Sequence, residues 1–293
     1  MLSILIPTYN YDCYDLVIEL HRQVYACHIS FEIIVANDCS TINFYKLQQI
    51  NQIPNCKLIN LEKNLGRAKI RNYLASIAKY DTLLFLDSDS YPATDNFIKN
   101  YLQHIANNIV ILGGRVYNDA ANADLSLLTK YGRKNEQNED SLTVSHKPFT
   151  SPNFLIPKNV FNKIKFNENI IGYGHEDTIF GIELNRNKIP YYRFNNPIIH
   201  LQIETNKIFI QKTNESIDNL YNIYLSRKYK ELELLSPVLN LYLKLHKFKL
   251  NRFFTYLYRN WAPNIIKYCD NKNPNLILFS LYKLCYLCHI ASK

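Results

Sequence analysis

No stretch of this 293-residue chain reaches the roughly 18 uncharged apolar residues that a membrane-spanning helix needs. Lys283 interrupts the best candidate, which is "NLILFSLYKLCYLCHIA". The chain also lacks the charged and then apolar leader of a secreted protein, and its seven cysteines show no paired spacing. We therefore expect free thiols and a cytoplasmic location.

Acidic residues are scarce at the end of the chain. From Ser236 onward there are nine Lys and Arg residues and one acid, Asp270, so this segment carries +8 of the formal net charge of +9. Glycine is absent beyond Glu204, and helical patterns dominate there. A basic surface attracts nucleic acid, anionic lipid or a phosphorylated substrate. We place a domain boundary here, with a catalytic domain over 1–205 and a helical region over 206–293.

The first half of the chain alternates between short apolar runs and amphipathic segments. Apolar runs without polar alternation indicate strands covered on both faces, and helices between them indicate a mostly parallel sheet. The sequence therefore predicts an α/β fold, a sheet sandwiched by helices. The expected strands are 2–7, 31–37, 56–61, 82–87 and 108–114, and the expected helices are 14–27, 43–50, 67–79 and 96–106.

A polar stretch over 119–147 follows, and we interpret it as a long excursion or lid. Arg133 and Lys134 lie in it, where they form either part of a lid over an acceptor or diphosphate, or a solvated loop. Apolar order resumes at "FTSPNFLIP" and continues to "PIIHL" near residue 200.

Polar residues follow four of the expected strands. In an open parallel sheet, ligands bind beyond the carboxyl ends of the strands, so these residues converge on one crevice. The crevice holds carboxylates, which repel each other unless a cation lies between them, and oxygen ligands suit Mg²⁺ or Mn²⁺. Helix capping or a turn before Pro92 is the other explanation of the acids. The strand-end residues are Pro7-Thr8-Tyr9-Asn10, Asn37-Asp38, Asn64 with Gly66 and Arg67, and Asp87-Ser88-Asp89.

Four segments in this order and spacing resemble the family 2 glycosyltransferases of GT-A fold: "ILIPTYN", "FEIIVANDCS", "NLGRAKIRN" and "LLFLDSDS". A fifth, "GYGHED", looks like the glycine-framed Glu-Asp signature of inverting galactosyl-, N-acetylgalactosaminyl- and chondroitin-type transferases. The resemblance covers about residues 1–205. It implies a Rossmann-like nucleotide-sugar-binding fold and transfer from a nucleotide-diphosphate sugar, a UDP-sugar above all.

The resemblance also assigns donor and metal residues. It implies that Asp38 accepts a hydrogen bond from uracil, although Asn37 replaces the aspartate common before it. Asp89 matches the principal ligand of Mn²⁺ or Mg²⁺, Asp87 its partner, and His200 a third ligand; a structural histidine is the alternative for His200. Arg71 lies near ribose or diphosphate, or makes a structural salt bridge. The nucleotide-sugar-binding set is Pro7, Thr8, Tyr9, Asp38, Asn64, Arg67, Arg71, Asp87 and Ser88.

The segment "GYGHEDTIFGIEL" also has a physical interpretation of its own. Gly172 and Gly174 permit close backbone approach to a ligand, and Glu176 and Asp177 then open a helix. Carboxylates in a first turn are favoured by the helix dipole, so capping alone explains them. An inverting transfer needs a general base that takes the proton of the acceptor hydroxyl. The resemblance makes Asp177 that base, with Glu176 bonding an acceptor or donor hydroxyl.

The basic tail mixes Lys and Arg with aromatic and aliphatic residues in "LNLYLKLHKFKLNRFFTYLYRNW". This pattern suits a helix at the headgroups of an anionic membrane, and it equally suits a helical cap on the catalytic domain. The membrane interpretation fits a peripheral enzyme on the inner face of the cytoplasmic membrane. Near the end, Cys285-x-x-Cys288-His289 matches a haem-attachment pattern, but packed cysteines are favoured there.

Two other classes stay open from the residues alone. A sugar-nucleotide nucleotidyltransferase would need a glycine-rich basic loop after the first strand, and "PTYNYDCYD" lacks one. A nucleic-acid-binding protein would carry its charge along a folded groove, whereas here the charge lies in an apolar tail, so no nucleic-acid partner is expected. The favoured class is an inverting, metal-dependent glycosyltransferase with a glycan or lipid-linked glycan acceptor, in bacterial surface polysaccharide synthesis.

Overall fold

The computed structural model of the chain describes residues 1–105, 108–117, 126–135, 142–145, 147–201, 204–271 and 273–292. The chain divides into two compact units. The first comprises Met1–Asn118, Glu136–Asn169 and Glu176–Gln202, and the second comprises Asp119–Asn135, Ile170–His175 and Ile203–Lys293. The chain therefore passes from the first unit to the second and back twice before the C-terminal helices.

The first unit is built on an eight-stranded sheet with the order β3-β2-β1-β4-β9-β6-β10-β8. The pairs β1·β2, β2·β3, β1·β4 and β6·β10 are parallel, and β9 lies antiparallel between β4 and β6. The predicted α/β class with a mostly parallel sheet is confirmed. The strands are β1 (Leu2–Thr8), β2 (Phe31–Asn37), β3 (Cys56–Asn60), β4 (Thr82–Leu86), β6 (Val110–Leu112), β8 (Thr143–Val144), β9 (Asn153–Pro157) and β10 (Tyr191–Arg193).

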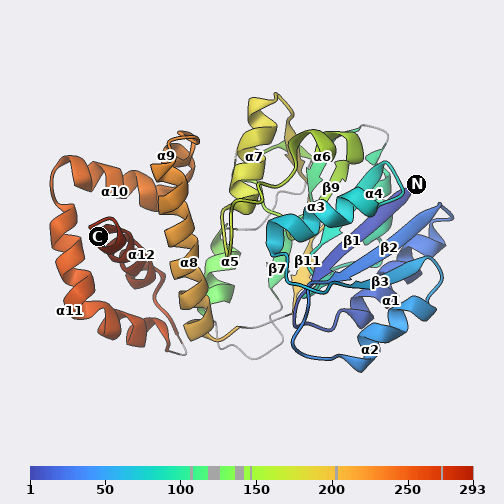
Figure 1. The fold of residues 1–293 in the computed structure, drawn as a ribbon, viewed down its shortest axis with the longest axis horizontal. Coiled ribbons are helices and arrows are strands. Elements are labelled where there is room, and N and C mark those ends of the chain that lie inside the picture. Colours follow the sequence, from blue (N-terminus) through green and yellow to red (C-terminus); the bar gives the residue numbers. More distant parts are fainter. Residues whose placement is uncertain are drawn as a thin grey trace. The chain divides into compact units, whose positions relative to one another are not determined.

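Helices cover both faces of this sheet, which explains the unbroken apolar runs (Figure 1). Successive residues of a strand point to opposite faces, so Ile4 of β1 packs in one core layer and Leu5 in the other. The first layer contains α1 (Tyr14–Ala26), α2 (Tyr45–Gln48) with the 3₁₀ turn Gln49–Gln52, and α4 (Phe97–Leu102). The second contains α3 (Arg67–Ile77), α6 (Lys158–Ile164) and α7 (Glu176–Arg186).

A second, three-stranded sheet has the order β5-β11-β7, from β5 (Ser90–Pro92), β11 (Ile198–His200) and β7 (Arg115–Tyr117). Strand β5 begins one residue after Asp89, and β11 ends at His200, paired with Ser90. Strands of three residues are too short to show a hydrophobic period in the sequence, but these bring the residue after Asp89 next to His200, which lies far along the chain.

The second unit, in its described part, is helical (Figure 1). Tyr282 of α12 and Phe209 of α8 pack in its core together with Leu127 of α5. Its helices are α5 (Leu127–Asn135), α8 (Asn206–Leu225), α9 (Leu232–Leu235), α10 (Pro237–Lys247), α11 (Asn251–Cys269) and α12 (Leu276–Ile290).

The polar stretch over 119–147 differs from the expected excursion in its middle. Residues 119–125, 136–141 and 146 of it lie outside the described residues, but Leu127–Asn135 form α5, and Leu127 is fully buried. Its apolar residues are too widely spaced among polar ones to mark a core helix in the sequence alone.

All seven cysteines are free, as predicted. Cys285 and Cys288 are buried on α12, and the His289 ring stacks on Tyr258 with 4.6 Å between centroids. The haem-like pattern is therefore part of ordinary helix packing. No helix in the described part of the chain is long and apolar enough to cross a membrane.

Candidate active site

The site begins where three parallel strands end at one edge of the large sheet. β1 ends at Thr8, its neighbour β2 at Asn37, and β4 at Leu86, just before Asp87. The backbone N–H of Asp38 donates to the Thr8 carbonyl over 2.8 Å, which ties the first two ends together. Pro7, Thr8 and Tyr9 thus lie beside Asp38, with Tyr9 half-exposed and Thr8 buried.

Asp38 organises the loop that starts α3. Its two carboxylate oxygens accept the backbone N–H groups of Leu65 at 2.6 Å and Gly66 at 2.9 Å, while the Asn64 amide donates to the Asp38 carbonyl over 2.9 Å. Gly66 has φ +78°, a left-handed conformation that favours glycine. A carboxylate offers about four acceptor positions, so Asp38 keeps acceptor positions for the predicted hydrogen bond from the uracil ring.

Arg71 connects the two acidic motifs. This side chain on α3 is buried, and its Nη2 donates to Asp87 Oδ1 over 2.7 Å. Its Nη1 donates to the Arg67 carbonyl over 3.1 Å and lies 4.0 Å from Glu176 Oε1. The guanidinium also lies over the Phe166 ring, 5.6 Å from the centroid. The D-x-D segment after β4 and the Glu-Asp pair at the start of α7 therefore face the same arginine.

Two further arginines complete this ion cluster. Arg67 Nη1 lies 3.7 Å from Glu176 Oε1, and Arg67 is the more exposed of the two arginines of α3. Arg115 Nη2 donates to Asp87 Oδ2 over 3.2 Å. Both Asp87 oxygens thus accept guanidinium N–H groups. The sequence analysis did not include Arg115 in the site, and the only signal for it was its position after Gly113-Gly114.

A buried amide network fixes the strand that carries Arg115. The Asn153 amide donates to the Gly114 and Asn196 carbonyls over 3.0 and 2.9 Å, and its oxygen accepts the Tyr101 hydroxyl over 2.6 Å. A Cβ at Gly113 would collide with Tyr101, Asn153 and Asn196, so only glycine fits there. A small pocket next to this network is lined by Gly114, Arg115, Thr150, Pro152 and Asn153.

Asp89 and His200 form a separate carboxylate–imidazole pair. His200 Nδ1 lies 3.5 Å from Asp89 Oδ2, and neither this nitrogen nor Asp89 Oδ1 has a hydrogen-bond partner although both are buried. Burial raises the pKa of Asp89, but His200 and the charges of Arg115 and Arg67 outweigh it, so the pKa falls to about 2. The carboxylate is therefore ionised at neutral pH.

Buried acceptor atoms without partners are costly, and a divalent cation would satisfy them. A carboxylate and an imidazole are a ligand pair that Mn²⁺ accepts, so these residues fit the expected metal. The described residues hold no cluster of three or more His, Cys, Asp or Glu suited to a metal. Tyr117 also contacts His200, with ring centroids 5.6 Å apart.

Asp177 is a partly buried carboxylate next to the buried Glu176 at the start of α7. Desolvation raises its pKa to about 7, and the neighbouring Glu176 charge adds to this, against the opposing effects of the Thr178 backbone N–H, Arg71 and Arg67. Its Oδ1 accepts the Thr178 N–H over 2.6 Å, so it also acts as a cap within the first turn of α7. Arg67 acts electrostatically on both Asp89 and Asp177.

The sequence model of glycosyl transferase family 2 matches residues 3–165, more than half of the chain. The chain belongs to glycosyl transferase family 2. The family resemblance noted from the sequence is thereby confirmed, and the glycosyltransferase class is selected over the two other classes. The matched span contains β1 to β9, with Asp38, Arg71 and the D-x-D.

Three known proteins illustrate what this chain is similar to. An uncharacterized glycosyltransferase of Haemophilus influenzae is 30% identical over 122 residues, which span 39% of this chain and 46% of that relative. A mannosyltransferase of Pyrobaculum calidifontis, solved with GDP-Man and Mn²⁺, superposes with TM-score 0.62 at 11% identity, covering 99% of this chain and 86% of that one. S. aureus TarS 1-349 with UDP-GlcNAc gives 0.51 at 17% identity, covering 100% and 92%. At these identities the two structures establish the fold.

Proposed function

We propose that this glycosyltransferase is an inverting, metal-dependent enzyme that moves a sugar from a nucleotide-diphosphate sugar, a UDP-sugar, to a glycan or lipid-linked glycan. The observation that carries the proposal is Arg71, which lies 2.7 Å from Asp87 and 4.0 Å from Glu176. One guanidinium thus lies beside both the strand end expected to bind the donor and the helix start expected to hold the general base. The departing diphosphate and the attacking acceptor hydroxyl need to meet at one anomeric carbon.

In this proposal the donor lies along the edge formed by β1, β2 and β4. Pro7, Thr8 and Tyr9 line the nucleoside, Asp38 accepts from the base, and Asn64 holds Asp38 in place. Arg67, half-exposed at the N-terminus of α3, faces the diphosphate, where a guanidinium and free helix N–H groups both favour negative charge. Ser88 lies in the turn after β4, and we keep it among the residues proposed to bind the nucleotide sugar.

Asp89 and His200 would hold Mn²⁺ or Mg²⁺. When bound, the cation stabilises the negative charge that develops on the departing diphosphate. The sequence analysis places Asp87 beside Asp89 as a ligand. Since both Asp87 oxygens accept guanidinium bonds, we assign Asp87 to holding Arg71 and Arg115 in position rather than to direct coordination.

Asp177 would take the acceptor proton. A base works best with a pKa near the working pH, and desolvation brings the pKa of Asp177 to about 7. Glu176, held by Arg67 and Arg71, would accept a hydroxyl of the acceptor or donor. A direct displacement needs no covalent intermediate, so one base on the acceptor side is sufficient.

The test uses the purified full chain, a panel of UDP- and GDP-sugars, and Mn²⁺ or EDTA, with release of nucleoside diphosphate as the readout. Asp177→Asn should lower turnover by about 10²- to 10⁴-fold and keep donor affinity. The control is Glu183→Gln, an acid-to-amide change farther along α7. Unchanged turnover in Asp177→Asn would remove the base assignment.

Calorimetry tests the metal site separately. Asp89→Ala should abolish metal-dependent donor binding, whereas Asp95→Ala, on an exposed side chain, should leave it intact. Donor binding that is equally metal-dependent in Asp89→Ala would contradict the ligand role.

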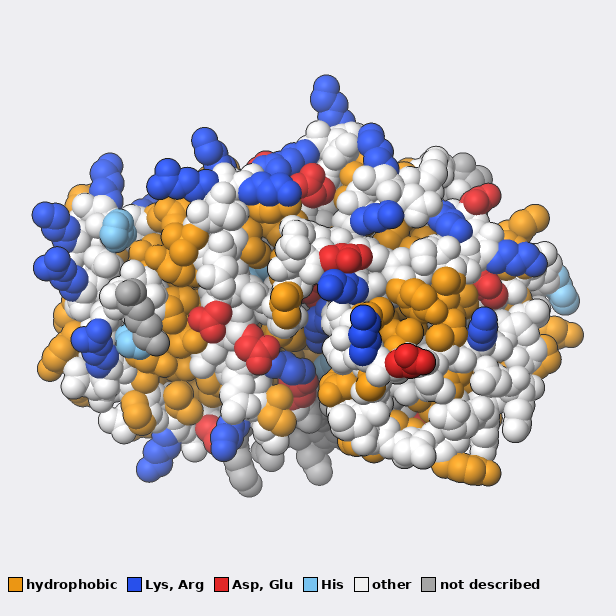
Figure 2. Space-filling view, viewed as in Figure 1, with side chains coloured by type: hydrophobic (Ala, Val, Ile, Leu, Met, Phe, Trp, Pro, Cys, Tyr) orange, Lys and Arg blue, Asp and Glu red, His pale blue; other side chains and the backbone are white. Residues whose placement is uncertain are grey.

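We also propose that α11 attaches the enzyme peripherally to an anionic membrane, where a lipid-linked acceptor would be found. With 100° between successive residues, Arg252, Arg259 and Lys267 lie within about 80° of one another on the exposed side of the helix. Phe253 and Trp261 lie on the adjoining exposed arc. Figure 2 shows Lys and Arg side chains gathered with hydrophobic ones over α10 and α11.

Basic residues beside exposed aromatic ones are the composition of a helix at a charged lipid surface. The full chain should therefore sediment with vesicles of phosphatidylglycerol and phosphatidylcholine at low salt, and not with phosphatidylcholine alone. Phe253→Ser combined with Trp261→Ser should lower the bound fraction, while Tyr45→Ser, at a more exposed aromatic in the first unit, should not. Equal sedimentation of all three proteins would contradict this role of α11.

A further inference from the structure

The loop immediately before Glu176 belongs to the second unit, not to the sheet. Residues Ile170–His175 group with α8, while Glu176 begins α7 of the first unit. The Asn219 amide of α8 donates to the Ile171 carbonyl over 2.9 Å and to the Tyr173 carbonyl over 3.1 Å. One side chain therefore holds two backbone carbonyls of this loop.

The same loop touches α8 at a second point. A Cβ at Gly174 would lie 2.5 Å from Ser216 Oγ, and the His175 ring nitrogen Nε2 lies 3.2 Å from that oxygen. Gly172, Gly174 and His175 have φ of +82°, +95° and +71°. Three left-handed residues within four positions form a conformation that surrounding contacts must maintain, above all at the non-glycine His175.

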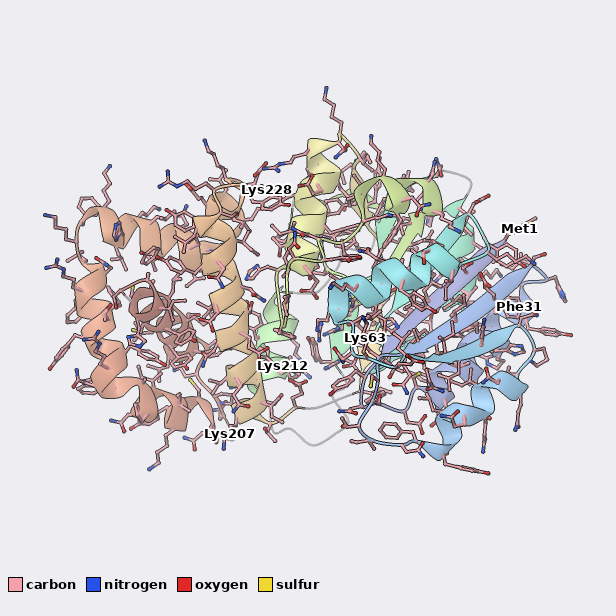
Figure 3. The ribbon with its side chains drawn as sticks, viewed as in Figure 1. Met1, Phe31, Lys63, Lys207, Lys212 and Lys228 are labelled. Carbon is pink, nitrogen blue, oxygen red and sulfur yellow. The ribbon has the colours of Figure 1, made fainter. Side chains whose placement is uncertain are left out.

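A third contact comes from Lys212, whose ammonium lies over the Tyr173 ring, 5.4 Å from the centroid. Lys212 also pairs with Glu204. Figure 3 shows Lys212 on α8. Lys212, Ser216 and Asn219 are spaced by four and three residues, so they share one face of the helix. This face of α8 is a continuous support for the loop.

We propose that Asn219 is a positioning residue for Asp177, acting through the Ile171 and Tyr173 carbonyls. The proposal rests on the proposed base. Only Gly174, His175 and Glu176 separate Tyr173 from Asp177, and the first two of them pack on Ser216. A change in the loop therefore passes directly to the start of α7. A displacement of about 1 Å of a reacting group is enough to lower turnover about 100-fold.

The first test is kinetic. Asn219→Leu and Asn219→Asp both remove the amide donors, and the aspartate keeps the size of the side chain. Both should lower kcat about 10- to 100-fold with the donor KM within about twofold, because only the acceptor-side group moves. Asn222→Leu and Asn222→Asp, on an exposed position of the same helix, should keep the kcat of the unmodified chain.

The second test separates positioning from a general loss of structure. In an Asp177→Asn background, Asn219→Leu should cause no further loss, since the group it positions is already absent. In addition, amide hydrogen exchange over residues 170–177 should speed up about tenfold or more in Asn219→Leu and stay unchanged in Asn222→Leu.

Each result has a defined consequence. An equal fall in kcat in both backgrounds, an unchanged kcat in both Asn219 variants, or unchanged exchange over 170–177 would overturn the positioning role alone. Full turnover in Asp177→Asn would instead overturn the proposed base, and the positioning role with it.

Discussion

Replacing Arg71 by Met tests the contact on which the whole site depends. The change keeps most of the aliphatic stem but removes the guanidinium that lies over Phe166 and carries the charge between Asp87 and Glu176. Removing one partner of a buried ion pair costs about 3–5 kcal/mol, since the other charge is left uncompensated. Here Asp87 keeps Arg115 at 3.2 Å and Glu176 keeps Arg67 at 3.7 Å, so we expect the lower end, about 3 kcal/mol.

Urea unfolding followed by far-UV circular dichroism measures this loss. With a dependence of about 2 kcal/mol per molar urea, the midpoint should fall by about 1–2 M. Arg22→Met is the matched control, because Arg22 also pairs with two carboxylates, at 2.7 and 2.6 Å, but is exposed. Exposed pairs contribute about 0–1 kcal/mol, so its midpoint should hardly move.

A second substitution identifies the cause. If the uncompensated Glu176 charge destabilises Arg71→Met, then adding Glu176→Gln should recover more than about 1 kcal/mol of the free energy of unfolding. An Arg71→Met variant that loses no more than Arg22→Met, or one that Glu176→Gln destabilises further, would refute the bridging role and with it the common site.

Two further predictions concern pH and packing. The pKa of Asp177 is raised to about 7 in the folded chain, whereas the unfolded chain releases this proton near pH 4. Between pH 4 and pH 7 the folded state therefore binds more protons than the unfolded state, and the free energy of unfolding falls as the pH rises. Asp177→Asn should therefore be more stable than the unmodified chain at pH 8, by on the order of a few kcal/mol, and no more stable near pH 4, as followed by urea unfolding at both pH values; equal stability at pH 8 would contradict the burial of this carboxylate. Gly113→Ala should lower the free energy of unfolding by about 1–3 kcal/mol through overpacking against Tyr101 and Asn153, as measured by urea unfolding. An unchanged unfolding midpoint in this variant would show that the network is not rigid.

Much of the first unit follows from local pattern. The strand 31–37 was predicted with the bounds that the structure has, and the runs at 2–7, 56–61 and 82–87 differ from β1, β3 and β4 by one residue at an end. These strands are buried on both faces, so their apolar runs are unbroken and polar residues mark their ends. Because parallel strands end at one edge, the same pattern places Thr8, Asp38 and Asp87 near each other without any knowledge of the fold.

Other features depend on pairs that the sequence does not connect. His200 reaches Asp89 because β11 pairs antiparallel with β5, a strand of three residues with no recognisable period. Arg115 reaches Asp87 because Asn153, on the antiparallel strand β9, fixes Gly114. Neither contact has a spacing along the chain from which it could be derived.

The sequence by itself determined the layered α/β fold, the family and the two acidic motifs. The fold follows from the pattern of apolar runs, and the family and the motifs are recognised in short contiguous segments. Only the tertiary structure decided that Asp87 and Glu176 share Arg71, that Asp89 and not Asp87 keeps a carboxylate oxygen without a partner, and that the loop before Asp177 packs on α8. These depend on distances between groups far apart in the chain, and such distances are set by how the sheet and the helices pack.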